Sequence, residues 1–303
     1  MSLLVDLVDD VTRHILSCWL WSEDVIKLDN AACSIAIRPK LLRVMNGLKL
    51  KKKVDMMRSA CQSSSFMQWA AARNIRPGAL KLDSWAVTDS GVAEDTLKKM
   101  VMYADVIRVS DSYGIGLVAD YATDVEKLRI RPCDRAAMAT LFSRPLVSVR
   151  TLVLSGCLHD FAPTLRSLSS AVPNQTHLDV HSTCISCKQV AYFLKNCPKL
   201  TSLDCTFCPN IGSALLTTRT SYPNLHTLKI AGTDLEILDN EARLLAQTFP
   251  SLTELTVTYA SNDALVTLAK AYPRLTSVTI GDAMSLTDTT IAQLAQHCPH
   301  LQQ

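Results

Sequence analysis

One sequence pattern recurs about every 25 residues along most of the 303-residue chain. An aromatic residue or a cysteine is followed by proline and then by apolar residues in the order L-x-x-L-x-L, as in YPNLHTLKIAGT and FPSLTELTVTYA. When the segments are aligned on their first apolar position, that position is occupied by Val125, Val149, Gln175, Leu200, Leu225, Leu252, Leu275 and Leu301. Pro77 and Ala104 extend the series towards the N-terminus. A period this regular predicts an array of stacked structural repeats.

Each repeat has two halves. In the first half, apolar and polar residues alternate, as around Leu228 and Ile230, and this alternation predicts a short strand. In the second half, apolar residues recur at helical spacing. Three such sets are Val190, Phe193, Leu194 and Cys197; Leu265, Leu268 and Tyr272; and Ile291, Leu294 and Cys298. One strand and one helix per repeat predict an α/β fold, a right-handed leucine-rich-repeat solenoid of about nine repeats over residues 77–303. We expect a horseshoe with parallel strands on its concave face and helices on its convex face.

Cysteines recur at fixed places in these repeats. The segments VRTLVLSGC, VEKLRIRPC and LTSLDCTFC end in cysteine, and SLTDTTIAQLAQHCPHL carries a turn, a helix and then Cys-Pro. The chain therefore resembles the cysteine-containing leucine-rich-repeat family of F-box/LRR proteins, over Pro77–Gln303. The resemblance is specific for the fold and much less specific for the function, because scaffolds of this kind host many different binding functions.

Residues 1–76 do not follow the repeat and have the apolar spacing of amphipathic helices. They resemble a degenerate F-box at seven positions, which are Leu7, Asp10, Val11, Ile15, Leu16, Trp19 and Leu20. In F-box proteins this helical unit docks a Skp-type adaptor of a cullin–RING ubiquitin ligase, and the resemblance implies adaptor docking here. A second interpretation stays open, in which these helices only cap the apolar end of the first repeat.

Composition restricts the partners and the cellular location. The formal net charge is only +3, which does not favour a dedicated nucleic-acid-binding protein. No apolar run reaches the roughly 18–20 residues that cross a bilayer, so we expect no membrane partner. The N-terminus lacks the basic start and the cleavage site of a signal peptide, and the odd number of 11 cysteines cannot pair completely within one chain. These features predict a cytoplasmic or nuclear protein.

Four cysteines have the generic spacing of a zinc ribbon: Cys184, Cys187, Cys205 and Cys208. The repeat register argues against zinc, because it places Cys205 and Cys208 in the core, where a free cysteine behaves as a small hydrophobic residue. Motifs of nucleophilic, phosphate-binding or metalloprotease chemistry are not found in the sequence. We therefore predict no metal site, no cofactor and no enzymatic activity.

The polar residues between the apolar strand positions should line the concave face. The candidate partner-binding residues are Arg108, Lys127, Arg129, Arg131, His177, Asp179, His181, Asp204, Lys229 and Glu254. The early repeats contribute a basic cluster and the middle repeats are rich in His and Asp. A protein with an acidic patch should be steered towards the basic end of this surface.

Two functions fit these features. In the first, taken from the resemblance, the chain is a substrate-recognition subunit of an SCF-type ubiquitin ligase: residues 1–40 dock the adaptor and the concave face binds a protein client. In the second, the chain is a stand-alone leucine-rich-repeat scaffold whose N-terminal helices only cap the solenoid. Both are protein–protein interaction functions.

Overall fold

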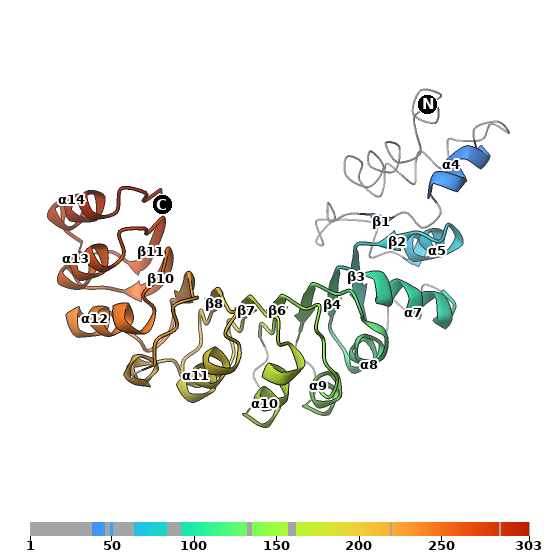
Figure 1. The fold of residues 1–303 in the computed structure, drawn as a ribbon, viewed down its shortest axis with the longest axis horizontal. Coiled ribbons are helices and arrows are strands. Elements are labelled where there is room, and N and C mark those ends of the chain that lie inside the picture. Colours follow the sequence, from blue (N-terminus) through green and yellow to red (C-terminus); the bar gives the residue numbers. More distant parts are fainter. Residues whose placement is uncertain are drawn as a thin grey trace. The chain divides into compact units, whose positions relative to one another are not determined.

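A computed structural model describes residues 38–45, 49–50, 64–83, 92–131, 135–156, 162–218, 220–284 and 286–302. The chain divides into two compact units, which we call unit 1 (Met1–Arg129) and unit 2 (Ile130–Gln303). Figure 1 gives the labels of the helices and strands. The F-box-like residues Leu7, Asp10, Val11, Ile15, Leu16, Trp19 and Leu20 lie outside the described residues.

Unit 1 contains the first parallel strand pairs. Its elements are α4 (Arg38–Met45), β1 (Lys49–Leu50), α5 (Ser64–Ala72), β2 (Arg76–Pro77), β3 (Ala79–Leu82), α7 (Glu94–Tyr103), β4 (Val106–Val109), α8 (Ser112–Tyr121) and β5 (Lys127–Ile130), of which β5 runs into unit 2. Strand β1 pairs with β2, and β3 pairs with β4 in a register that aligns Leu80 with Ile107 and Leu82 with Val109. Both strands of the second pair begin where the periodicity predicts them.

Unit 2 repeats one strand and one helical segment. Its elements are α9 (Arg135–Leu141), β6 (Thr151–Val153), α10 (Ala162–Ala171), β7 (His177–Asp179), α11 (Cys187–Asn196), β8 (Ser202–Asp204), the 3₁₀ helix η2 (Ser213–Thr218), β9 (Thr227–Ile230), α12 (Asp239–Thr248), β10 (Glu254–Tyr259), α13 (Asn262–Ala271), β11 (Ser277–Asp282) and α14 (Asp288–His297). Within the described residues, β3 to β11 form one sheet in chain order, and its strands are parallel. This is the leucine-rich-repeat solenoid that the sequence predicts.

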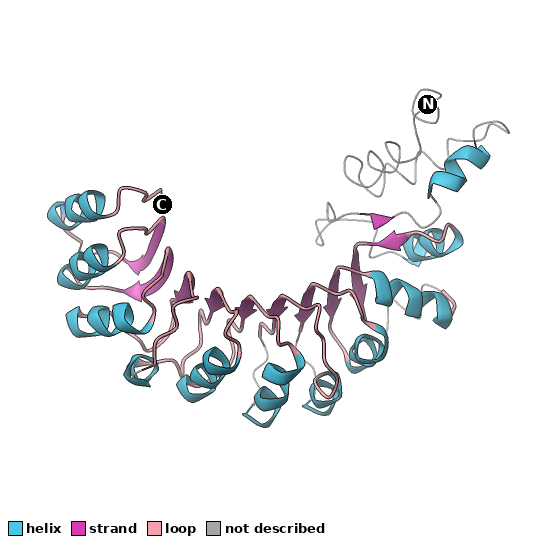
Figure 2. Ribbon diagram, viewed as in Figure 1, coloured by secondary structure: helices cyan, strands magenta, loops and turns pink. Residues whose placement is uncertain are grey.

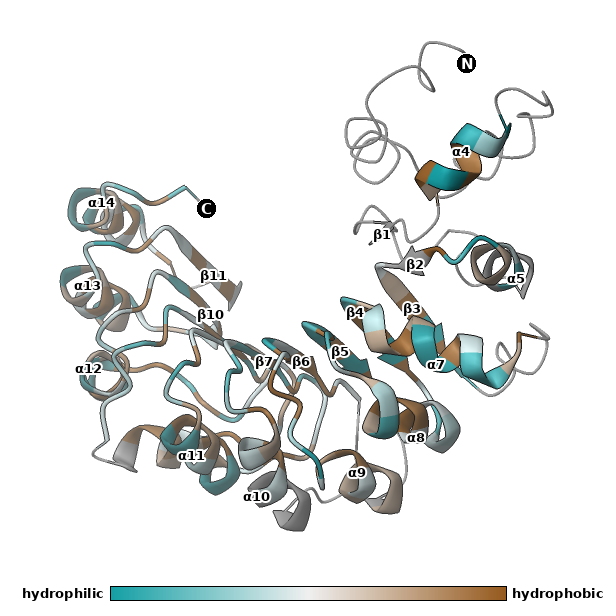
Figure 3. Cartoon of the chain, turned by 45° about the vertical axis from the view of Figure 1, so that its right-hand side comes forward, coloured by the Kyte–Doolittle hydropathy of each residue, from teal (hydrophilic) through white to brown (hydrophobic). Residues whose placement is uncertain are grey.

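The apolar residues of successive strands lie directly beside one another in unit 2. The register aligns Leu152, Leu178, Leu203, Leu228 and Leu255. All five side chains are buried, and Leu228 is 0% exposed. Because burying one leucine contributes about 1.5–3 kcal/mol, this ladder is a main source of stability. In Figure 3 the helices of unit 2 carry both hydrophobic and hydrophilic segments, as expected for helices that pack one face against such a core.

The helix predictions hold with one exception. In α11, Val190, Phe193 and Leu194 are buried, as predicted. In α14, Ile291 was expected to be in the core but is 55% exposed, whereas Thr290 is 3% exposed. The Thr290 hydroxyl donates a 2.6 Å hydrogen bond to Asn262 Oδ1 of α13, which turns Thr290 inward and Ile291 outward. The prediction for Ile291 was wrong because a polar contact sets the rotation of this helix.

Among the described residues, none of the helices combines the length and the hydropathy needed to span a bilayer.

Candidate protein-binding surface

One face of the sheet in unit 2 carries no described helix. Figures 1 and 2 show α9 to α14 on the other side of strands β6 to β11. We call the helix-free side the open face of unit 2. Side chains alternate between the two sides along each strand, so the residues beside a buried leucine point to the open face. The burial pattern of β7, with Leu178 buried between the less buried His177 and Asp179, is typical of these strands.

The open face is ordered in rows across the strands. One row aligns His177 with Ser202, Thr227, Glu254 and Ser277, and a second aligns Asp179 with Asp204, Lys229, Thr256 and Thr279. In β9, Lys229 is exposed between two buried neighbours, and in β10 Glu254 is exposed beside the buried Leu255. The structure thus brings together five of the sequence-predicted residues in the two rows, which are His177, Asp179, Asp204, Lys229 and Glu254.

Hydrogen bonds fix the acidic side chains of this surface. Asp179 Oδ1 accepts a hydrogen bond from the backbone N–H of His181 at 3.1 Å and lies 2.7 Å from His181 Nδ1. In the next strand, Asp204 Oδ1 accepts from the backbone N–H of Thr206 at 3.0 Å. Holding a carboxylate in this way removes the entropy cost of ordering it when a partner binds. Asp179, His181 and Asp204 are therefore preorganised for recognition.

Asp179 lies within ion-pair distance of His181, and the other charged side chains of the two rows differ from it. Within the described residues, no ion pair engages Asp204, Lys229 or Glu254. Asp204 and Lys229 are neighbours in the register, so opposite charges lie side by side in one row. Such an arrangement can recognise a complementary pattern of charges on a protein surface.

The predicted basic residues fall in different environments. Lys127 and Arg129 in β5 are half-buried on either side of the buried Leu128, as the alternation predicts, and Arg131 is exposed. Arg108 was expected to be exposed but is only 6% exposed. All four residues of β4 are buried. Arg108 is therefore not available to a partner as the prediction required.

The cysteines with zinc-ribbon spacing are in separate environments. Cys205 and Cys208 are buried in the core, as the register predicts, whereas Cys184 is exposed. Burial raises the pKa of the Cys205 thiol well above its ordinary value and also raises the pKa of Cys208. Cys187 Sγ is held 3.2 Å from the backbone N–H of Gly212. Within the described part of the chain, no three His, Cys, Asp or Glu side chains are placed to hold a metal ion.

Comparison with known proteins shows the fold and no more. No protein-family model and no curated protein matches the chain. Among solved structures, it is similar to a chain in the crystal structure of the Rad7 and Elc1 complex in yeast, with 13% identity, 97% of this chain and 86% of that chain covered, and a TM-score of 0.56. The leucine-rich repeat-containing protein LegL7 from Legionella pneumophila has 13% identity, coverages of 91% and 89%, and a TM-score of 0.43. Internalin C2 from Listeria monocytogenes has 18% identity, coverages of 63% and 79%, and a TM-score of 0.36.

The parallel strands and the helical segments of the described residues form a leucine-rich-repeat solenoid, a fold suited to protein interaction, and the similarity to the chain from the Rad7 and Elc1 complex agrees with this fold.

Proposed function

We propose that the chain is a non-enzymatic protein-interaction module and that the open face of unit 2 binds a protein client. The observation that carries this proposal is the second row of the sheet, where Asp179, Asp204 and Lys229 lie side by side in strict register. Both carboxylates accept backbone N–H hydrogen bonds, and Asp204 and Lys229 form no ion pair within the described residues. An ordered pattern of mixed charge gives an interface its specificity. A polar face suits a protein surface better than a small molecule, which needs a mostly apolar site.

The finer proposal is that the chain is the substrate-recognition subunit of an SCF-type ubiquitin ligase. Its support is the F-box resemblance of residues 1–40, which would dock a Skp-type adaptor while the open face selects the client. The structurally similar chain from yeast was crystallised in a complex of Rad7 and Elc1, so a chain of this fold can form a complex with a second protein.

A charge exchange tests client binding at the open face. The double variant Asp204→Lys with Lys229→Glu keeps the net charge but reverses the local pattern. We expect proteins that crosslink to the wild-type chain in cell extract to be lost from this variant. They should be retained by Lys195→Glu, which changes an exposed lysine of α11 away from the open face. Equal capture by both variants would contradict client binding at this face.

Adaptor docking is tested separately with purified components. The full chain and a chain without residues 1–40 are each immobilised and exposed to a purified Skp-type adaptor. The proposal predicts that only the full chain retains the adaptor. Absence of binding by the full chain would favour the stand-alone scaffold, and it would leave client binding at the open face unaffected.

A further inference from the structure

Three successive repeats of unit 2 end their helical half with an aromatic residue that precedes a proline, at Tyr222, Phe249 and Tyr272. Phe249 and Tyr272 are the C-cap residues of α12 and α13, and both are buried. The rings of Tyr222 and Phe249 stack with their centroids 5.7 Å apart. In the repeat before Tyr222, the equivalent C-cap residue of α11 is Cys197. A thiol occupies much less space than a ring, so the series of rings ends at Tyr222.

A pocket lies where this series ends. It has a volume of about 200 Å³ and is lined by residues of the repeat that contains Cys197 and of the next repeat. Four of the lining residues are buried in the core, which are Leu194, Cys197, Leu200 and Leu225. The half-buried Tyr222 forms a further wall. The lining is therefore mostly apolar, and we call this site the Cys197 pocket.

Hydrogen bonds hold the two sides of the pocket in place. Asn224 Nδ2 donates to the carbonyl of Pro198 at 2.9 Å, and both residues line the pocket. The backbone N–H of Tyr222 donates to the carbonyl of Thr248 in α12 at 2.7 Å. Because these contacts fix the lining before a ligand binds, less entropy is lost on binding.

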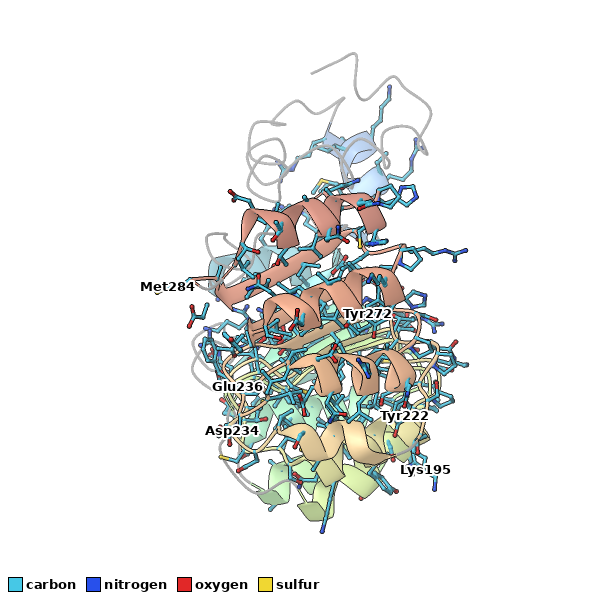
Figure 4. All side chains as sticks on the ribbon, turned by 90° about the vertical axis from the view of Figure 1, so that its left-hand side faces the viewer. Lys195, Tyr222, Asp234, Glu236, Tyr272 and Met284 are labelled. Atoms are coloured by element: carbon cyan, nitrogen blue, oxygen red, sulfur yellow. The ribbon has the colours of Figure 1, made fainter. Side chains whose placement is uncertain are left out.

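The rim of the pocket is positively charged. Lys195 lies in the last turn of α11, lines the pocket and is exposed. Within the described residues, no ion pair engages it. Residues 187–226 contain four Lys or Arg residues and a single acidic residue, Asp204, which lies on the open face. Figure 4 shows Lys195 and Tyr222 along the same edge of unit 2. The site therefore favours a ligand that carries negative charge beside its apolar part.

The volume of the pocket indicates what can fill it. Sites for drug-sized molecules have volumes of about 300–1,000 Å³, so the Cys197 pocket is small for such a ligand. A cavity of about 150 Å³ accepts a benzene ring. One aromatic side chain of a partner protein therefore fits. Phe249 is not among the lining residues, so such a ring would reach Tyr222 from the side of the preceding repeat and extend the stack.

We propose that the Cys197 pocket binds a protein segment in which an aromatic residue is flanked by acidic residues. The ring of the segment stacks on Tyr222, and its carboxylates pair with Lys195. An aromatic side chain that fills a desolvated pocket is a usual energetic centre of a protein interface. The pocket is separate from the open face, and this inference does not rest on the proposed function. A protein held at the open face does not depend on Lys195.

Synthetic peptides test this chemistry directly. The unlabelled peptide GSEEFEEGS is titrated into the full chain at low ionic strength by isothermal titration calorimetry. Two matched peptides are GSEEAEEGS, which lacks the ring, and GSKKFKKGS, which reverses the charge. We expect each matched peptide to bind at least about fivefold more weakly than GSEEFEEGS. Equal affinity of GSEEFEEGS and GSEEAEEGS, or no binding of GSEEFEEGS, would overturn the proposal.

A pair of lysine variants separates the pocket from general charge effects. Lys195→Gln removes the charge at the rim and should weaken the binding of GSEEFEEGS about threefold. Lys188→Gln removes an exposed lysine from the first turn of the same helix and should leave the affinity unchanged. If both variants lose affinity equally, binding follows net charge alone and the proposal is wrong.

Two further variants block the pocket. Cys197→Phe places a ring inside it, as at the equivalent Phe249, and should abolish peptide binding while the Tm is unchanged or higher, because the change fills a cavity. Ser221→Trp covers the pocket from its exposed rim and alters no core residue, and it should also abolish binding. Ser213→Trp changes an exposed residue of η2 outside the pocket and should have no effect. Unchanged affinity in Ser221→Trp would overturn the proposal even if Cys197→Phe does not fold.

Sedimentation velocity tests for a different occupant of the pocket. We expect the wild-type chain and Ser221→Trp to sediment alike at the concentrations of the titration. A wild-type dimer that Ser221→Trp converts to a monomer would identify a second copy of the chain as the occupant and would contradict the proposal.

Discussion

At the scale of single residues, Leu228 and Lys229 are adjacent in sequence and point to opposite sides of strand β9. Leu228 is fully buried and Lys229 is exposed. We expect Leu228→Asp to lower the free energy of unfolding by at least about 3 kcal/mol, because it removes a buried leucine and buries an unpaired charge. Lys229→Ala should change it by less than about 0.5 kcal/mol. Urea denaturation of both variants measures the difference, and equal losses would contradict the register.

The sequence predicts such alternation well because period two is a local property of a strand. For this reason it correctly predicts that Leu228 and Cys205 are buried and that Asp204 lies on the other side of its strand. It fails for the exposure of Arg108, which is only 6% exposed, because alternation within a strand does not encode how far the surrounding residues cover a side chain. It also does not predict the left-handed backbone of Phe207 (φ 55°), although glycine with a left-handed backbone occupies the corresponding position of other repeats, at Gly156 and Gly232.

At the scale of elements, a partly buried hydrogen bond accompanies the rotation of α14. The buried Thr290 donates to Asn262 Oδ1, and the Thr287 side chain caps the start of the same helix. We expect Thr290→Val to destabilise the protein by about 1 kcal/mol, because it removes this hydrogen bond without changing the side-chain volume much. Ile291→Ala should have an effect within about 0.5 kcal/mol. Thermal or urea unfolding that shows the opposite order would mean that Ile291 is the buried residue.

Apolar spacing predicts a helix after each strand. It does not determine which residues of that helix face the core, or whether the segment forms an α-helix or a 3₁₀ helix. The segment Ser213–Thr218 forms a 3₁₀ helix where the neighbouring repeats have α-helices of ten residues. The spacing of Ile211, Leu215 and Leu216, all buried, is compatible with either helix. The choice between them depends on packing against α11 and α12, which is a tertiary effect.

At the scale of the whole molecule, buried thiols make the stability depend on pH in the alkaline range. Burial raises the pKa of Cys197 from 9.0 to about 11, and it raises the pKa values of Cys205, Cys208 and Cys298. The unfolded chain therefore loses these protons at lower pH than the folded chain does. The free energy of unfolding should fall as the pH rises above about 9, and it should be fully retained below that value.

Thermal melts at pH 7.5 and pH 10 measure this dependence. The Tm of the wild-type chain should be lower at pH 10. In Cys197→Ala the difference between the two values should be smaller, because one of the groups with a raised pKa is missing. A Tm that is equal or higher at pH 10 would contradict the burial of these thiols.

Carboxyl footprinting of a captured complex tests whether a protein partner binds the open face of unit 2. The free chain and the complex with a protein that crosslinks to it are each treated with carbodiimide and glycine ethyl ester, and the modified residues are identified by mass spectrometry. We expect Asp204 and Glu254 to be modified in the free chain and protected in the complex, while Asp263 and Asp288 at the starts of α13 and α14 react equally in both. Protection of Asp263 and Asp288 with unchanged modification of Asp204 and Glu254 would contradict it.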